Sequence, residues 1–381
     1  MMEFFRGISV VREAGLKFCQ TSLFRKSGAK LRKMRHGTLS ESLFSLYLHP
    51  KTLILFIMEN TTLDKPYVIG LDMGGTNSVF GIVNQRGNII AQTAISTKAY
   101  PDVNDYVAAA KTALLPIIEE VGGIEKIKGM GIGAPNGNYY NGTIEYAANL
   151  VWEGVVPIGK LFEEALGVPV HVTNDANAAA LGEMTYGVAR GMKNFIMITL
   201  GTGVGSGIVV DGKVVYGCDG FAGELGHVIY DRSPEARQCG CGRKGCLETY
   251  TSATGVARTA RLMLEKSDAP SPLRDLEPEK ITSYDVFLAA EQGDQLAKDI
   301  FEYTGKILGQ SCANYALFSS PEAFVFFGGL TKAGHYIMDP IQRAYDEEIL
   351  NIYKGKAKIL VSSLQGSEAA VLGASALGWE D

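Results

Sequence analysis

The sequence is short of cysteine, of long apolar runs and of net charge. Six cysteines in 381 residues are too few for a disulfide framework. The longest apolar stretch near the start, residues 53–58, falls far short of the ~20 residues that a transmembrane helix needs. No apolar core lies near residues 10–20, where a signal peptide would carry one. We therefore expect a cytoplasmic protein that crosses no membrane.

Composition is that of a globular protein with an excess of glycine. Hydrophobic residues make up 46% and charged residues 20% of the chain, which permits a large buried core and excludes global disorder. A length of 381 residues predicts two domains. The 45 glycines exceed the typical share of ~7%. Such an excess indicates tight turns or close approaches of the backbone to a ligand.

The net charge of −5 is unevenly distributed along the chain. Residues 1–57 hold ten Lys or Arg against three Asp or Glu, giving +7, and the remainder holds 26 against 38, giving −12. The acidic remainder argues against nucleic acid as the main partner. Three interpretations of the basic N-terminal extension 1–57 stay open: a nucleic-acid-binding arm, a targeting extension, or a dispensable segment upstream of a start at Met58, disordered or wrongly assigned.

From Tyr67 onward, buried strands alternate with amphipathic helices, a pattern typical of an α/β fold. A strand–glycine turn–strand hairpin occurs twice, and Gly74 of the first copy aligns with Gly201 of the second, 127 positions later. Two such units predict two related α/β lobes around one cleft. We expect strands over residues 67–73, 78–83, 88–96, 127–134, 168–173, 195–200, 208–210 and 323–327. We expect helices over residues 102–121, 158–166, 175–186, 250–265, 283–317 and 367–377.

The two glycine turns carry candidate phosphate-binding residues. Glycine lets backbone N–H groups point at an anion without a Cβ atom in the way. Each turn alone could be a plain hairpin, but a nucleoside triphosphate needs phosphate contacts from both sides of a cleft. Asp72, at the end of the first strand, is well placed to hold Mg²⁺ through water. The candidates are Asp72, Gly74, Gly75 and Thr76 in the first turn and Gly201, Thr202, Gly203 and Gly205 in the second.

Half of the cysteines are crowded into eight positions. Cys239, Cys241 and Cys246 follow His227, which lies twelve positions before the first of them. Three cysteines and one histidine are a standard tetrahedral zinc set. The alternative is a group of buried cysteines without metal. Since the sequence offers no open ligand position, it predicts a closed, structural zinc site.

Three acidic residues are candidates for chemistry. Asp175 follows a predicted strand and begins a predicted helix, where an aspartate is most often an N-cap. The functional alternative is a general base at the floor of the cleft. Glu224 and Glu248 flank the cysteine cluster and would be surface acids by default.

Six motifs, in a fixed order, give the sequence from Lys65 to the end a specific resemblance. It resembles the ROK family (repressor, open reading frame, kinase), and within it the bacterial glucokinase-like sugar kinases. The motifs span residues 71–77, 173–183, 200–205, 222–227, 239–248 and 327–330. The resemblance implies a two-lobed, actin-like (ribonuclease H-like) ATPase fold with a cleft between the lobes. The small lobe would comprise residues 58–180 completed by a C-terminal helix, 366–381, and the large lobe residues 181–365 with the zinc-binding loop.

The resemblance also implies an activity. It is that of an ATP-dependent hexose kinase, foremost a glucokinase, acting on the sugar 6-hydroxyl as a homo-oligomer (dimer or tetramer). Asp175 would be the catalytic base, Gly328 and Gly329 would lie against the adenosine, and ATP, Mg²⁺ and structural Zn²⁺ would be bound. Sugar hydroxyls would be held by Asn149, Asn174, Glu224, His227 and Glu248, and zinc by His227, Cys239, Cys241 and Cys246.

Departures from the family pattern leave alternatives open. Residues 133–138 read Gly-Ala-Pro-Asn-Gly-Asn where the family usually has Gly-x-Pro-Gly, and Ala148 stands where proline often precedes the asparagine. N-acetylmannosamine, fructose and mannose therefore stay open as substrates. The main alternative to an enzyme is a sugar-responsive transcriptional repressor of the same family. Residues 1–57 are, however, short for a winged-helix DNA-binding domain with its linker. The third functional hypothesis is an actin-like ATPase without a sugar pocket. The cysteine cluster with its flanking glutamates argues against this hypothesis.

Overall fold

The computed structural model describes residues 65–364 and 366–380, all within the compact unit Leu63–Asp381. The basic extension 1–57 lies outside these described residues. Among the helices that are described, none combines the length and the apolar character needed to cross a membrane.

The first sheet is built around the first glycine hairpin. Its strand order is β3 (Ile89–Ser96), β2 (Asn77–Asn84), β1 (Tyr67–Met73), β4 (Ile127–Gly133) and β8 (Val170–Thr173). Strands β1, β2 and β3 are antiparallel, whereas β4 and β8 run parallel to β1. Because side chains alternate along a strand, Val68 packs with Val371 on one face while Ile69 and Leu71 enter a larger core on the other.

The second sheet repeats this arrangement around the second hairpin. Its order is β11 (Lys213–Val214), β10 (Val204–Val210), β9 (Phe195–Leu200), β12 (Ala323–Phe327) and β13 (Lys358–Val361). Strands β9, β10 and β11 are antiparallel, and β12 and β13 run parallel to β9. The duplication expected from the hairpins therefore extends to the whole order and direction of the strands.

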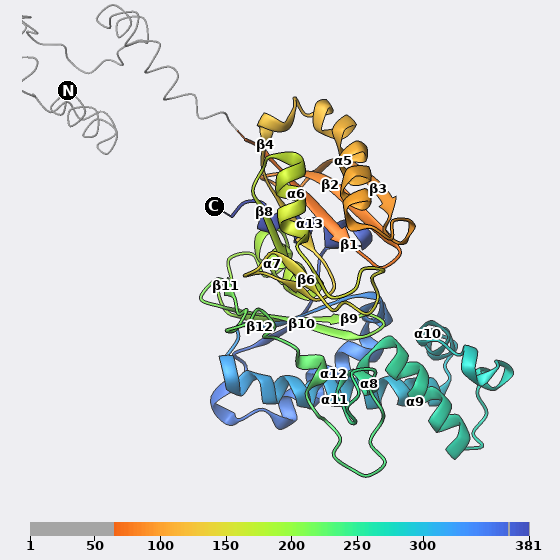
Figure 1. Cartoon of the computed structure of the whole chain (residues 1–381). Coiled ribbons are helices and arrows are strands. Elements are labelled where there is room, and N and C mark those ends of the chain that lie inside the picture. The colour runs from red at the N-terminus through yellow and green to blue at the C-terminus, as the bar shows by residue number, and fades with distance from the viewer. Residues whose placement is uncertain (1–64, 365, 381) are drawn as a thin grey trace, which may run out of the picture. The chain divides into compact units, whose positions relative to one another are not determined.

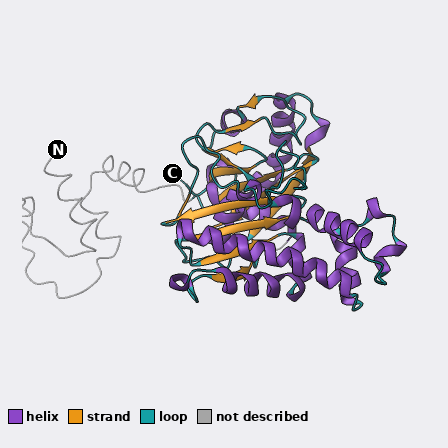
Figure 2. Ribbon diagram, turned by 90° about the horizontal axis from the view of Figure 1, so that it is seen from below, coloured by secondary structure: helices purple, strands orange, loops and turns teal. Residues whose placement is uncertain are grey.

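Helices form three layers with the two sheets (Figure 1). Helices α5 (Val103–Glu120) and α6 (Ile158–Leu166) cover the outer face of the first sheet. Helices α9 (Ala253–Lys266), α11 (Gln295–Ser319) and α12 (His335–Glu348) cover the outer face of the second, joined by α8 (Glu248–Thr251) and α10 (Ser283–Glu291). Helices α7 (Asp175–Tyr186) and α13 (Gly366–Leu377) lie between the sheets and contact both each other and the strands. Figure 2 shows the strands enclosed by helices.

A small third sheet extends the loop that follows β4. It consists of β5 (Gly137–Asn138), β6 (Thr143–Glu145) and β7 (Val155–Val156), paired in that order. The family departure at residues 133–138 lies at its start. Asn136 adopts a left-handed backbone with φ 51° and donates its side-chain amide to the Glu145 carbonyl at 2.9 Å. Asparagine tolerates this conformation, which is the one that glycine would favour in the family pattern.

Most predicted elements are present, with differences that have physical causes. Strand β10 begins at Val204 rather than at residue 208, so the end of the second glycine turn is already strand. The helix expected over 283–317 is two helices, separated at Gly293 with φ 92°. The helix expected over 250–265 is interrupted at Ser252, whose side chain caps α9. Helix α12 and strand β13 were not predicted.

Close backbone contacts hold α7 between the sheets. A Cβ on Gly182 of α7 would lie 2.7 Å from the Cα of Gly373 in α13, and a Cβ on Gly207 of β10 would lie 2.7 Å from the Ala180 Cβ. Both distances are shorter than atoms tolerate, so the missing side chains let these elements touch. Helix α7 also runs across residues 180 and 181, where the lobe boundary was placed, and contacts strands of both sheets.

The substitution Gly182→Ala tests this packing. Helix propensity alone would make alanine more stabilising than glycine by about 1 kcal/mol. The overlap with Gly373 reverses the sign, and we expect a loss of roughly 1–3 kcal/mol in the free energy of unfolding, measured in urea. Ala179→Gly in the same helix is the control, because it changes propensity in the opposite direction. Opposite signs for the two variants would contradict the packing argument.

Candidate active site

Asp175 stands at the first position of α7, two residues after the end of β8. The residue that caps this helix is Asn174, whose side-chain oxygen accepts the Asn177 amide at 2.7 Å. Asp175 itself accepts the Ala176 amide at 2.8 Å. Its side chain is accessible to solvent, yet enough protein surrounds it for burial to raise the pKa of its carboxyl. An accessible but enclosed carboxylate of this kind is within reach of a small molecule.

The charge of Asp175 acts on two other carboxylates, which come from different parts of the chain. Asp72 is half-buried near the end of β1, and its pKa is raised from 3.8 to about 6, first by burial and then by the charge of Asp175. The pKa of Glu224 is raised by burial and by the charges of Asp175 and Glu248, while His227 lowers it. The structure therefore brings together Asp72 of the first sheet and Glu224, from the loop that follows β11, around the start of α7.

The first glycine turn lies against the loop that carries Asn149. The turn is closed by the Gly74 amide, which donates to the Asn77 carbonyl at 3.0 Å. A Cβ on Gly75 would overlap the carbonyl oxygen of Asn149, so this close contact requires a residue without a side chain. Thr76 is exposed, and its carbonyl accepts the Thr97 amide at 2.9 Å. Asn149 is thus placed beside the predicted phosphate turn.

The second glycine turn is held by the segment around α8. The Ala253 amide donates to the Gly201 carbonyl at 2.9 Å, and the Thr254 hydroxyl donates to the Thr202 carbonyl at 2.9 Å. Gly205, the last glycine, donates its amide to the Thr199 hydroxyl at 3.1 Å. A Cβ on Gly205 would lie 3.0 Å from the Cβ of Ala176. This glycine therefore brings the second hairpin against the residue next to Asp175.

Gly328 and Gly329 follow β12 and lie beside the second turn. Gly328 has φ 111°, and a Cβ there would overlap the carbonyl oxygen of Leu200, the residue before Gly201. Gly329 begins the short 3₁₀ helix η6 (Gly329–Ala333), is exposed, and has no atom near its Cβ position. The pair therefore leaves an open backbone surface next to the second glycine turn.

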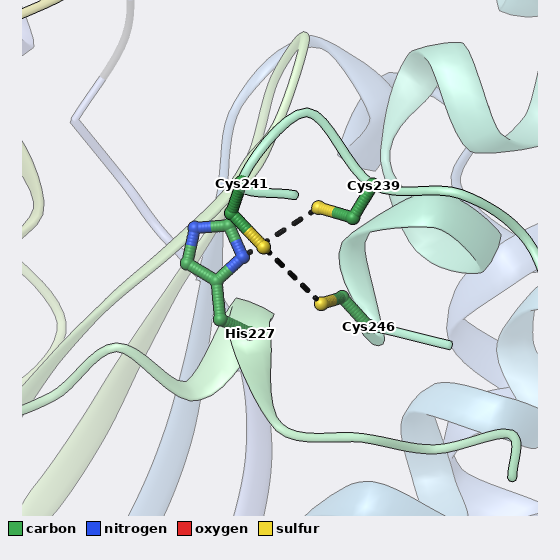
Figure 3. Close-up of side chains that lie close together, drawn as sticks. All are labelled: His227, Cys239, Cys241 and Cys246. Atoms are coloured by element: carbon green, nitrogen blue, oxygen red, sulfur yellow. Dashed lines mark hydrogen bonds between the residues drawn. The ribbon is translucent and has the colours of Figure 1, made fainter. Parts of the chain in front are cut away.

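The four predicted zinc ligands converge (Figure 3). His227 ends the 3₁₀ helix η3 (Leu225–His227), and the potential ligand atoms of His227, Cys239, Cys241 and Cys246 all lie within 4.8 Å of one another. The Cys239 sulfur is 3.8 Å from Nδ1 of His227, and the sulfurs of Cys241 and Cys246 are 3.6 Å apart. A tetrahedron of zinc–sulfur bonds near 2.3 Å places its ligands about 3.8 Å apart, which these separations match. The cluster fits a zinc ion.

Glu248 connects this cluster to the second glycine turn. Its Oε2 accepts the Val204 amide at 3.0 Å, and the Cys239 thiol donates to its Oε1 over 3.7 Å. A Cβ on Gly203 would overlap Oε2, so the glycine is what admits the carboxylate. The cysteine cluster and the second glycine turn are far apart in the sequence, whereas in the structure the Glu248 side chain contacts both of them.

Two contributors to the site carried little signal in the sequence. Thr199 lies within an apolar strand, and only the fold shows that its hydroxyl accepts a hydrogen bond from the Gly205 amide. Arg237, two residues before Cys239, is buried. An isolated arginine in a polar stretch normally indicates a solvent-exposed side chain, so nothing in the sequence distinguished it.

The duplicated sheets, with α7 between them and a glycine turn in each, define the two-lobed actin-like (ribonuclease H-like) ATPase fold. The sequence model of the ROK family matches residues 68–380. The chain belongs to the ROK family.

Relatives within the family include kinases and regulators. A glucokinase of Halalkalibacterium halodurans is 36% identical over 321 residues, covering 82% of this chain and 94% of the relative. A crystal structure of a ROK family glucokinase from Streptomyces griseus, in complex with glucose and AMPPNP, has a TM-score of 0.66 and 33% identity, covering 82% and 98% of the two chains. A xylose repressor of Caldicellulosiruptor bescii is 26% identical over 312 residues, covering 81% of this chain and 77% of the repressor.

The raised pKa of Asp72 gives a prediction for stability against pH. Because the folded state holds this proton more tightly than the unfolded chain, stability is lost as pH rises from about 4 through the folded pKa of about 6. Asp72→Asn removes this ionisation. Without added nucleotide or metal, we expect the variant to be more stable than the wild type at about pH 8 by roughly 1–3 kcal/mol, with the difference shrinking below about pH 4.

Urea unfolding across that pH range measures the effect. Asp268→Asn is the control, because Asp268 is exposed on a loop outside the site. The expectation fails if Asp72→Asn shows the same stability difference at every pH or is less stable than the wild type at the alkaline end.

Proposed function

We propose that this protein is an ATP-dependent hexose kinase with glucose as its substrate. The observation that carries the proposal is the position of Asp175: an accessible, enclosed carboxylate between Asp72 and Glu224, at the start of α7. The family relatives that are named as glucokinases support the same reaction.

Asp175 acts as the general base. A sugar hydroxyl is a poor nucleophile at neutral pH, and a positioned carboxylate that takes its proton accelerates the reaction by roughly 10²–10⁴. The hydroxyl oxygen forms a bond to the γ-phosphorus of ATP as the bond from that phosphorus to the ADP oxygen breaks, and the proton moves to Asp175. Burial raises the pKa of Asp175, which makes the carboxylate a stronger base than an exposed aspartate.

The sugar hydroxyls bind to polar side chains around this base. Glu224 and Glu248 accept hydrogen bonds from two hydroxyls, and a sugar lacking one of them is rejected because a carboxylate is left unpaired. The remaining contacts come from neighbouring loops and helix starts, namely Asn149, Asn174 and His227. The support for this set is that each residue lies beside Asp175, Gly75 or the cysteine cluster.

The two glycine turns receive the phosphates of ATP. Backbone amides of Gly74, Gly75 and Thr76 on one side and of residues 201–205 on the other would meet the phosphate oxygens, with Gly328 and Gly329 against the adenosine. Mg²⁺, when bound, neutralises phosphate charge and would be held through Asp72. Positioning and charge stabilisation of this kind supply most of the catalysis of phosphoryl transfer.

Zinc has a structural role in this proposal. With three thiolates and His227 it would fill a closed tetrahedral site, which fixes the residues on either side of it. Glu224 precedes His227 by three residues, and Glu248 follows Cys246 by two. The metal would therefore stiffen both acidic residues of the sugar site.

Lobe closure and assembly complete the proposal. The small lobe, residues 58–180 with 366–381, and the large lobe, residues 181–365, would close around the substrates and exclude water. We further propose a cytoplasmic homo-oligomer, dimeric or tetrameric. Phe318, Leu350 and Ile352 have exposed apolar side chains and are candidate contacts of such an assembly.

The repressor alternative rests on the basic extension 1–57 and on the repressor relatives. A gel-shift assay with DNA from upstream of the gene, using chains with and without residues 1–57, separates the two functions. Salt-sensitive binding that depends on the extension would favour the repressor.

Asp175→Asn tests the general base. We expect the turnover number for hexose phosphorylation to fall by roughly 10²–10⁴, because the amide cannot accept the proton, while the sugar still binds with nearly unchanged affinity. Steady-state kinetics measure the first quantity and calorimetry the second. Asp268→Asn, outside the site, should leave both unchanged. A turnover number close to that of the wild type would remove Asp175 from this role.

Cys241→Ser tests the zinc site. Cys241 is exposed, so the loss of one sulfur has little direct effect on packing. We expect the zinc content, measured by mass spectrometry, to fall from about one ion per chain and the midpoint of thermal unfolding to drop by at least about 3 °C. Cys218→Ser is the matched control, because Cys218 is also exposed but lies outside the cluster. Equal zinc contents and midpoints in both variants would contradict the site.

A further inference from the structure

Arg237 is a buried cation at the base of the cysteine loop. Only 7% of its surface is exposed, which is rare for an arginine without an ionic partner. Among the described residues, no carboxylate forms an ion pair with it. Its guanidinium instead lies over the ring of Tyr250, 4.4 Å from the ring centre.

The guanidinium is hydrogen-bonded to the two helices that follow the cysteine loop. Nη1 donates to the Thr249 carbonyl of α8 at 2.9 Å and to the Gly255 carbonyl of α9 at 3.3 Å. Nη2 donates to the Thr259 hydroxyl of α9 at 3.0 Å. One side chain therefore spans α8 and the first turns of α9.

The backbone of Arg237 closes the cysteine loop at the same point. Its amide donates to the Tyr250 hydroxyl at 3.1 Å, and its carbonyl accepts the Gly245 amide at 2.8 Å. The Tyr250 hydroxyl in turn donates to Oδ2 of Asp231 at 2.6 Å. Arg237 thus joins both ends of the loop to α8 through bonds that involve no cysteine.

Helix α8 needs such support. It has four residues, too few to be stable on its own hydrogen bonds, and it begins with Glu248. The Glu248 carboxylate reaches the Val204 amide at 3.0 Å, so its place beside the second glycine turn depends on the orientation of this one turn of helix.

We propose that Arg237 is a positioning residue for Glu248, holding α8 so that the carboxylate faces the site through contacts independent of the metal. The inference rests on the proposed function, in which Glu248 binds a sugar hydroxyl. Arginine suits the task because its planar fork donates to several acceptors at once, whereas lysine offers a single ammonium that cannot span them.

The alternative is that Arg237 stabilises the fold without acting on the site. The two roles differ in which substrate they affect. Displacement of Glu248 removes a direct sugar contact and reaches the second glycine turn only through the Val204 amide, so it raises the KM for hexose by a larger factor than the KM for ATP. A general loss of stability changes both KM values by the same factor, or neither.

The experiment uses Arg237→Met in the full-length chain, which keeps the side-chain length and removes the donors. We expect the KM for glucose to rise by roughly tenfold to a hundredfold, because buried acceptors are left unpaired and α8 shifts. The KM for ATP, which depends on Glu248 only through the Val204 amide, should rise by a clearly smaller factor, below about fivefold. Zinc content should equal that of the wild type. Arg237→Lys should recover part of the loss. Arg258→Met is the control, since Arg258 is half-buried and its side chain, among the hydrogen bonds of the described residues, donates only to the Gln238 carbonyl, at 3.3 Å.

A double-mutant cycle between Arg237 and Glu248 tests whether Arg237 acts through Glu248. In a Glu248→Gln background, Arg237→Met should add less than about twofold to the KM for glucose, because its effect passes through the same carboxylate. Should Arg237→Met destabilise the chain too far for kinetics, Thr259→Val removes one acceptor of the same network and should raise the KM for glucose selectively. Independent, multiplicative effects of Arg237→Met and Glu248→Gln overturn the proposal.

Hydrogen exchange separates this inference from the proposed function. The amides of residues 247–252 should exchange at least about tenfold faster in Arg237→Met than in the wild type, a readout that needs no activity. If the wild type phosphorylates no hexose, the proposed function fails while this comparison still tests the contact. Unchanged exchange in α8 with unchanged KM for glucose overturns the positioning role.

Discussion

Helix α7 touches its neighbours backbone to backbone, and the rest of the molecule is arranged around that contact. Gly182 meets Gly373 of α13, and Gly205 and Gly207 admit Ala176 and Ala180 against β10. No side chain of any size fits at these points. Because α7 packs against strands of both sheets, its first residue lies where the two sheets meet, and that residue is Asp175.

This position explains the electrostatics of the site. Asp175 lies close to Asp72 from the first sheet and to Glu224 from the loop that follows β11, and burial raises the pKa of all three carboxyls. Holding like charges this close costs stability, and a fold tolerates such a cost where binding or chemistry makes use of the groups. On the other side of the site, Glu248 joins the cysteine cluster to the second glycine turn. The proposed sugar, phosphate and zinc sites thus share their supporting residues.

Much of the fold could be predicted from the sequence, where local signals were strong. Strands β1, β9 and β12 are short apolar runs followed by glycine, and α6 is ended by Gly167 in a left-handed conformation. Helix α12 was missed because it begins after Gly334 without a capping side chain and also has Pro340 inside it, whereas α5, which contains Pro116, is announced by the cap Asp102. Strand β13 was missed because an edge strand of four half-exposed residues has no alternating pattern.

In the candidate site, too, the features with a local sequence signal could be predicted and the others could not. The four predicted zinc ligands share one spacing motif, so their convergence was predictable. The link from Glu248 to Val204 joins residues 44 positions apart, and the partners of Arg237 come from two later helices. Contacts of this kind follow from packing, and no local pattern in the sequence encodes them.

The central claim is that the residues around α7 transfer phosphate from ATP to a hexose. A coupled assay of ADP release by the full-length chain, over a panel of glucose, N-acetylmannosamine, fructose and mannose, tests it most directly. The account predicts ADP release that requires a sugar and is fastest with glucose. ADP release that proceeds equally without any sugar, or none with every sugar, would contradict it.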